Sequence, residues 1–181
     1  MEFDDYVHSL SPLWFNTSYY KDYDKFKKLF ELESESRRDS GDSVVFYLQN
    51  YEYPSIIDSE KEYIKYLKQH VEKMPFKNVV YKKSWWVDYP KHSYAGLHSH
   101  TPGRQFTCVL FLDDYVEEKD HPHAGYLYGV LNNNNRITYE EWKPEAGTLV
   151  IMDGRMWHGT YPTRHKRRVF VVDFEYDMGE F

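Results

Sequence analysis

The second half of this 181-residue chain constrains the fold most, because from Asn78 onward it consists of short runs rich in β-branched and aromatic residues. Strong breakers, such as Asn132–Asn135 and the Pro144/Gly147 pair, separate several of these runs. We expect strands at Val79–Tyr89, Gly96–His100, Gln105–Leu112, Gly125–Leu131, Ile137–Trp142, Thr148–Met152, Trp157–Tyr161 and Val169–Tyr176. Short strands divided by turns in this way favour a β-sandwich or a barrel.

The first part of the chain follows a different pattern. Tyr23–Arg38 and Ser59–Met74 place apolar residues at helical spacing, whereas Ser43–Tyr51 between them has the composition of a strand. The chain shows no internal repeat and no linker between domains. We therefore expect one mainly β (α+β) domain over residues 1–181, with a helical flank that carries one strand (1–77) and a β core (78–181).

Composition excludes several classes of protein. The net charge is −6, from 23 Lys and Arg against 29 Asp and Glu, which argues against a nucleic-acid-binding protein with a broad basic surface. No apolar run approaches the roughly 18 residues of a membrane span, so no membrane partner is expected. The single Cys108 can form no internal disulfide, and the acidic first residues MEFDDYVHSL lack the pattern of a secretory signal. These features predict an intracellular (cytoplasmic) protein.

Three histidines of the β half have the spacing of a metal site. His98 and His100 are two residues apart in an expected strand, so their side chains leave the same face. His158 follows the apolar run Thr148–Met152 and lies in the expected strand Trp157–Tyr161, where it can bring a third nitrogen to the same ion. Histidines that bind no metal are an alternative interpretation of the same spacing. A further pair, His121 and His123, flanks a proline in acidic surroundings and is predicted to lie in an exposed loop.

Two more residues can complete a ligand pocket. Arg168 lies ten residues after His158 and immediately before the apolar run VFVVDF, so it can enter the strand, unlike the four basic residues before it. An arginine is the planar, permanently charged partner that a buried carboxylate requires. Tyr89 lies nine residues before His98, where an adjacent strand can offer a phenol to the same carboxylate.

These residues resemble a known family. The segment from Trp85 to Phe174 is similar to the Fe(II)- and 2-oxoglutarate-dependent oxygenases, in particular the prolyl-4-hydroxylase-like branch and its small phage and bacterial members. The resemblance is carried by Tyr89, His98-Ser99-His100 followed by Thr101-Pro102-Gly103, Thr107–Leu112, Gly125–Leu127, Pro144–Val150, His158 and Arg168–Val171. It implies a double-stranded β-helix, that is, a jelly-roll or cupin-like barrel.

The resemblance also implies an activity and its residues. The chain would be a dioxygenase, a hydroxylase of an amino-acid or peptidyl (prolyl-type) substrate, that uses Fe(II) and the cosubstrate 2-oxoglutarate and releases succinate and CO2. His98, His100 and His158 would bind the iron. Arg168, with Tyr89 and Thr107, would bind the distal carboxylate of 2-oxoglutarate. The expected partner is thus a small molecule or a peptide.

His100 departs from the pattern, because the family usually has a carboxylate two residues after its first histidine. A three-histidine site still binds Fe(II), but it carries one negative charge less. The alternatives are a two-histidine site completed by water, or a carboxylate from elsewhere, for which Asp113, Asp114 and Asp153 are the nearest candidates.

Two other interpretations of the sequence remain. The spacings His98-x-His100 and Gly147-x10-His158 also match cupins, in which a three-histidine iron oxidises a small molecule without 2-oxoglutarate. Cupins have no need of Arg168. The loss of the carboxylate at position 100 also allows a non-catalytic barrel that serves as a binding module.

Overall fold

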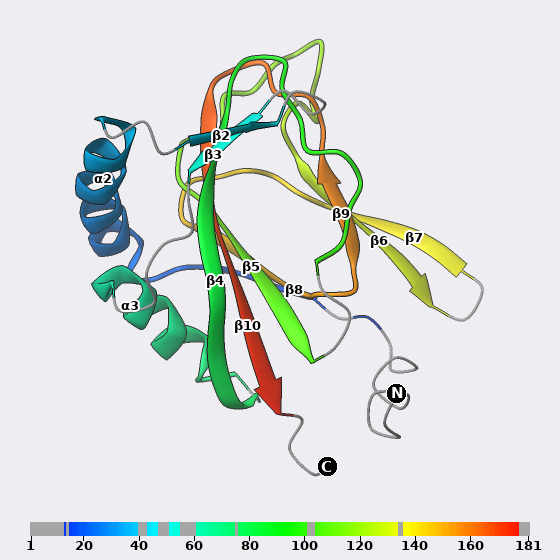
Figure 1. Ribbon diagram of the computed structural model, residues 1–181. Coiled ribbons are helices and arrows are strands. Elements are labelled where there is room, and N and C mark those ends of the chain that lie inside the picture. The colour runs from blue at the N-terminus through cyan, green and yellow to red at the C-terminus, as the bar shows by residue number, and fades with distance from the viewer. Residues whose placement is uncertain are drawn as a thin grey trace.

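The computed structural model describes residue 13 and residues 15–39, 43–46, 51–54, 61–74, 76–100, 104–133 and 136–177. Two antiparallel sheets face each other in this part of the chain (Figure 1). The large sheet has the order β1 (Phe15–Tyr19), β8 (Thr148–Asp153), β5 (Gln105–Phe111), β10 (Arg167–Asp177), β4 (Lys77–Tyr89), β3 (Tyr51–Pro54), β2 (Ser43–Phe46). The small sheet has the order β7 (Arg136–Trp142), β6 (Leu127–Asn133), β9 (Trp157–Thr160).

Two helices cover the face of the large sheet that is turned away from the small sheet (Figure 1). Helix α2 spans Tyr23–Asp39 and α3 spans Glu62–Val71, close to the ranges predicted from the helical spacing. Phe26 and Phe30 of α2 are fully buried, and their ring centroids lie 5.0 and 5.8 Å from that of Phe170 on β10. Neither helix, nor any other helix in the described ranges, is long and apolar enough to cross a membrane.

The N-terminal flank contains more strands than the sequence predicts. Two strands, β2 and β3, pair where one strand was expected at Ser43–Tyr51. A further strand, β1, pairs with the edge of the large sheet at β8. The side chains of β1 are mostly exposed, so the strand lacks the alternation of apolar and polar residues that reveals a half-buried strand in a sequence.

The strand predicted at Gly96–His100 is wrong. This segment forms a single β-bridge, in which His98 and His158 exchange two backbone hydrogen bonds of 2.9 and 2.7 Å. Its next backbone contact comes from the amide of His100, which donates to the carbonyl of Gly154. The amide of Thr160 on β9 also donates to the carbonyl of Ala95, so the chain follows β9 from Ala95 to His98 and then runs on toward β8.

The remaining predicted strands of the β half correspond to β4 to β10, with ends shifted by at most a few residues. Alternation along β10 decides what each residue contacts. Phe170, Val172 and Phe174 belong to the core under the helices, whereas Val169 and Val171 belong to a second core between the two sheets. The space between the sheets therefore receives every second residue of β10.

Candidate metal centre and pocket

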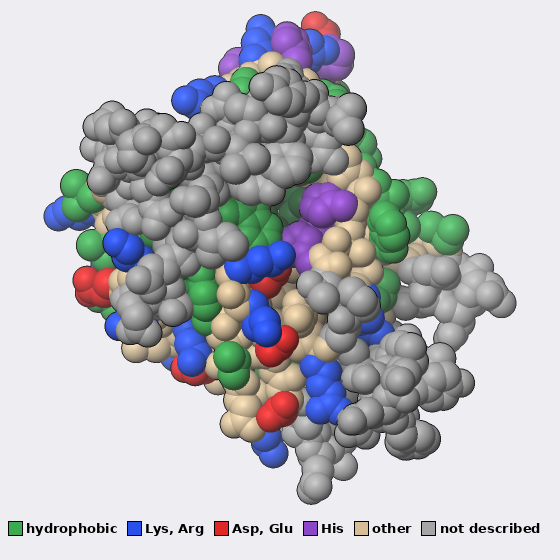
Figure 2. Space-filling view, viewed as in Figure 1, with side chains coloured by type: hydrophobic (Ala, Val, Ile, Leu, Met, Phe, Trp, Pro, Cys, Tyr) green, Lys and Arg blue, Asp and Glu red, His purple; other side chains and the backbone are tan. Residues whose placement is uncertain are grey.

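A cavity of about 460 Å³ lies between the two sheets. Its walls are largely apolar and come from both sheets, and histidines stand on one side. Figure 2 shows histidine side chains at the rim of a hollow, next to hydrophobic side chains. Residues that line the cavity include Trp85, Val87, Tyr89, Val109, Phe111, Leu127, Val169 and Val171. A concave, mostly apolar site with a few convergent polar groups is the usual form of a ligand pocket.

The structure brings the three predicted histidines together. His98 and His100 lie on the segment between β4 and β5, and His158 lies on β9 and is 4% exposed. One ring nitrogen from each histidine lies within 4.8 Å of those of the other two. The ring centroids are 4.5 to 5.5 Å apart. Among the described residues, no other group of three histidine, cysteine or acidic side chains converges in this way.

Hydrogen bonds orient all three rings in the same sense. The Nδ1 atom of His98 lies 2.7 Å from the carbonyl oxygen of Gly96, and the Nδ1 atom of His158 lies 2.9 Å from the carbonyl oxygen of Met156. The Nδ1 atom of His100 lies 2.7 Å from Oδ1 of Asp173. Oxygen acceptors favour a proton on Nδ1, so each ring directs its Nε2 atom to the outside of these hydrogen bonds, where it can serve as a metal ligand. Three such nitrogens are a ligand set for a divalent transition metal.

The surroundings keep two of the rings neutral. Burial lowers the pKa of His98 below 6.5, and the neighbouring His100 lowers it further. Burial lowers the pKa of His158 well below 6.5, and the proximity of His100 and His98 acts in the same direction. The neutral imidazole is the form that binds a metal. The donor set therefore fits an iron site, and it is complete without a carboxylate ligand.

The alternative carboxylate ligands lie elsewhere. Asp113 accepts hydrogen bonds from Arg168, Asp153 accepts two from the Arg155 side chain, and Asp114 is exposed. None of these three belongs to the converging group of metal-binding side chains. The third candidate metal ligand, beside His98 and His158, is thus His100.

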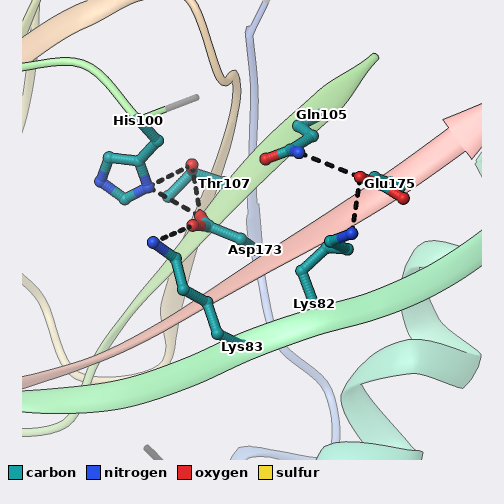
Figure 3. Close-up of polar contacts among 7 residues, drawn as sticks. All are labelled: Lys82, Lys83, His100, Gln105, Thr107, Asp173 and Glu175. Atoms are coloured by element: carbon teal, nitrogen blue, oxygen red, sulfur yellow. Dashed lines mark hydrogen bonds and ion pairs between the residues drawn. The ribbon is translucent and has the colours of Figure 1, made fainter. Parts of the chain in front are cut away.

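His100 rests on a buried polar cluster (Figure 3). Thr107 Oγ1 donates to Asp173 Oδ1 at 2.8 Å and lies 2.8 Å from His100 Nδ1. Lys83 Nζ lies 3.6 Å from Asp173 Oδ2. Thr107 was expected to bind the distal carboxylate of 2-oxoglutarate. Its hydroxyl group instead contacts Asp173 and His100, and Thr107 does not line the cavity. Sequence reasoning missed Asp173, although a lone aspartate within the apolar run VFVVDF was a visible signal.

Arg168 does not reach the pocket. Its Nη2 atom lies 3.0 Å from Oδ1 of Asp113 and 3.6 Å from Oε1 of Glu31 on α2. The hydrogen bond with Asp113 raises its pKa. The contact with Glu31 places Arg168 on the helical side of the large sheet. Successive side chains of a strand point to opposite faces, so the residues next to Arg168 point toward the small sheet.

The preceding residue, Arg167, lies against the wall of the pocket. It is 7% exposed, and its guanidinium carbon lies 4.5 Å from the ring centroid of Tyr89, a residue of the pocket wall. None of its three guanidinium nitrogens has a hydrogen-bond partner among the described residues. Burial lowers its pKa to about 10. A buried, unpartnered guanidinium is costly, and an anionic ligand would compensate it.

Two features fix Arg167 in place. Tyr89, predicted from the sequence as part of this site, lies under the guanidinium, and burial raises the pKa of its phenol. The backbone of Gly125 also approaches closely: a Cβ atom there would lie 3.2 Å from Nε of Arg167. The φ angle of Gly125 is +75°, which favours glycine.

The tryptophans, which can line such a pocket, divide among several environments. Trp85 lines the cavity, with its ring centroid 5.5 Å from that of His100. Trp86 is buried under α2, Trp142 belongs to the core between the sheets, and Trp157 is exposed. His121 and His123 are exposed, as predicted, and His123 pairs with Glu141 at 2.8 Å.

Comparisons with known proteins identify the fold. No protein-family model and no curated sequence matches the chain. A prolyl-4-hydroxylase from Pseudomonas putida superposes with a TM-score of 0.66 at 16% identity, over 94% of this chain and 97% of that one. HygX from Streptomyces hygroscopicus, solved with nickel and 2-oxoglutarate bound, superposes with a TM-score of 0.68 at 12% identity, over 97% and 87%.

A third similar structure is a prolyl hydroxylase from Trichoplax adhaerens in complex with a peptide fragment. Its TM-score is 0.65 at 15% identity, over 96% of this chain and 87% of that one. The chain therefore has the double-stranded β-helix fold of the 2-oxoglutarate- and iron-dependent oxygenases, which confirms the predicted fold class.

Proposed function

We propose that the chain is an Fe(II)- and 2-oxoglutarate-dependent dioxygenase. One observation carries the proposal: a three-histidine centre lines an apolar pocket, and a buried arginine without a hydrogen-bond partner lies against Tyr89 in the wall of that pocket. A cationic metal and an anionic cosubstrate are the two ligands that these groups would compensate. The fold, shared with enzymes solved with 2-oxoglutarate, supports the same proposal.

His98, His100 and His158 would hold the iron through Nε2. Because their Nδ1 atoms are bonded to oxygen acceptors, the rings are oriented before the metal arrives, which lowers the entropic cost of binding. Bound Fe(II) would activate O2, the oxidant: one oxygen atom would go to 2-oxoglutarate, which would become succinate and CO2, and the other would go to the substrate as a hydroxyl group. The protein's own contribution is to orient the reactants and to exclude water from an apolar cavity.

Arg167 would bind the distal carboxylate of 2-oxoglutarate, in place of Arg168. Its guanidinium offers several donors that no described residue uses. Charge-assisted hydrogen bonds to an arginine are stronger than neutral ones, and burial strengthens them further. The phenol of Tyr89, next to the guanidinium, would be a second donor to the same carboxylate.

The substrate is proposed to be an amino acid or a peptidyl (prolyl-type) side chain that is hydroxylated. Similarity to prolyl hydroxylases, one of them solved with a peptide, supports this proposal. A small-molecule substrate is the second candidate, because HygX was also solved with hygromycin B. Trp85 and Lys83, which line the cavity beside His100, are the side chains that a substrate would meet there.

Anaerobic titration of the metal-free protein tests the proposal without a substrate. Fe(II) is added first and 2-oxoglutarate second, and the visible charge-transfer band that arises when a keto acid chelates iron is recorded. We expect the band only when both are present. Iron binding without the band would instead indicate a cupin-type enzyme that does not use 2-oxoglutarate, and no iron binding would indicate a non-catalytic barrel.

A further inference from the structure

The three histidines of the centre differ in what holds them. Backbone carbonyl oxygens accept the Nδ1 protons of His98 and His158, whereas a carboxylate, that of Asp173, accepts the proton of His100. Asp173 is 1% exposed. Both kinds of oxygen orient the ring that donates to them. A carboxylate also brings a full negative charge close to the centre, which a carbonyl oxygen does not.

We propose that Asp173 is a positioning residue that supplies the negative charge of the metal site through His100. This inference rests on the metal site proposed above. Three imidazoles are neutral ligands, so a divalent ion among them would keep its charge of +2 in a largely apolar pocket. A carboxylate one hydrogen bond away from the ligand compensates part of that charge and makes the imidazole a stronger donor.

The state of the Asp173 carboxylate supports this role. Its Oδ1 atom accepts from His100 and Thr107, but its Oδ2 atom has no hydrogen-bond partner among the described residues. The nearest cation is Lys83, whose side chain is 43% exposed and whose Nζ lies 3.6 Å from Oδ2. Solvent screens a contact of that kind, so the buried charge is only partly compensated. A cation bound at His100 would complete the compensation.

The strands hold Asp173 in position. In the register of β5 and β10, Asp173 lies directly opposite Thr107, so the hydrogen bond between them is a cross-strand contact on one face. The register of β10 with β4 shifts between Asp173 and Phe174. Such an irregularity re-aims side chains, and here it occurs next to the residue that contacts the histidine.

The same two strands contain a matched control (Figure 3). Glu175 lies two residues further along β10, accepts a hydrogen bond of 3.1 Å from Gln105 on β5, and pairs with Lys82 at 2.8 Å. The Glu175 cluster therefore repeats the carboxylate, the lysine and the β5 partner of the Asp173 cluster but contacts no histidine. Glu175→Gln removes a carboxylate charge two residues away, from a side chain that is 42% exposed, without touching the centre.

The first experiment measures Co(II) affinity of the metal-free full chain by calorimetry, because Co(II) accepts the same nitrogen ligands as Fe(II) and is stable in air. Asp173→Asn keeps the shape and an acceptor oxygen for His100 but removes the charge. We expect it to weaken Co(II) binding about 10- to 100-fold, as is usual for outer-shell partners of metal-bound histidines. Glu175→Gln should change the affinity less than about two-fold.

The second experiment removes the ligand through which Asp173 is proposed to act. In His100→Ala only His98 and His158 remain, so we expect weaker Co(II) binding than in the wild type. Adding Asp173→Asn to this variant should change the affinity less than about two-fold, because the carboxylate no longer acts through a ligand. The same substitution would then weaken binding in one background and not in the other, which a general loss of structure cannot produce.

The outcomes separate the two proposals. If the wild type binds neither Co(II) nor Fe(II), the proposed function and this inference both fail. If the wild type binds Co(II) and Asp173→Asn binds it equally well, only the inference fails. If Asp173→Asn does not fold, Asp173→Ser takes its place, and Co(II) binding by Asp173→Ser as tight as in the wild type would overturn the inference.

Discussion

The two faces of the large sheet are built from the same strands but differ in what fills them. On the helical face, aromatic rings interlock: Phe170 lies within 6 Å of Phe26, Phe30 and Tyr63, measured between ring centroids. On the other face, β-branched residues such as Val169 and Val171 border a cavity of about 460 Å³. One face is filled for stability, and the other leaves room for ligands.

This difference shows how much a single position along a strand decides. Arg168 contacts Asp113 and Glu31 near the helical layer, whereas its neighbour Arg167 lies against Tyr89 in the pocket wall. Phe174 belongs to the helical core, and its neighbour Asp173 supports His100. A shift of one residue exchanges the two faces, so the comparison can be tested position by position.

Substitution of a large residue on the helical face should have the largest effect on stability. Phe170 is fully buried among aromatic rings, so Phe170→Ala should lower the free energy of unfolding by about 3–5 kcal/mol. Val171→Ala, on the pocket face, should cost about 1–2 kcal/mol, because it enlarges an existing cavity. Urea unfolding of both variants measures the difference. Equal losses would contradict the distinction between the two faces.

Removal of one of the three converging histidines should weaken metal binding strongly without a comparable loss of stability. His158→Ala takes away one of three nitrogens, and we expect Co(II) affinity to fall by more than the roughly 100-fold expected for an outer-shell substitution. His123→Ala removes an exposed histidine that pairs with Glu141 and should leave the affinity unchanged. Calorimetry of both variants checks the prediction. Tight Co(II) binding by His158→Ala would remove His158 from the centre.

The smallest effect is expected for the pH dependence of the free energy of unfolding that His70 causes on the helical side of the large sheet. Burial lowers the pKa of His70 in the folded protein below 6.5, and Lys73 and Lys21 lower it further. The unfolded chain therefore takes up the proton first. Stability should fall as the pH drops from 6.5 to the lowered pKa and should lose nothing more below it. His70→Gln should reduce the dependence on pH, measured by urea unfolding at pH 7.5 and 5.5. An unchanged dependence would contradict this assignment.

Periodicity predicted much of the fold. Helical spacing located α2 and α3 to within a few residues, and the β-rich runs located most strands of the two sheets. Periodicity failed to predict segments that are held by pairing with a neighbouring strand and that show no alternation of apolar and polar residues. β1 is largely exposed and is held by its register with β8, and His98 pairs with β9 at a single bridge. Such contacts are made between distant segments and leave no local pattern.

The site was predicted to the level of residue types. His98, His100 and His158 converge as the spacing implied. The sequence pointed to Arg168, whereas the neighbouring Arg167 lies against the pocket wall, because a sequence shows that a strand alternates but not which face the first residue takes. The supporting residues are harder to predict: Thr107 and Asp173 meet only through the register of β5 with β10.

The comparison of Arg167 with Arg168 tests the central claim most directly. Each is changed to alanine, and 2-oxoglutarate is titrated anaerobically into the Fe(II)-loaded variant while the charge-transfer band is followed. We predict that Arg167→Ala weakens 2-oxoglutarate binding about 10- to 100-fold with iron still bound, since a buried charge-assisted contact is lost. Arg168→Ala should bind like the wild type. Unchanged binding by Arg167→Ala, or a loss confined to Arg168→Ala, would contradict the account.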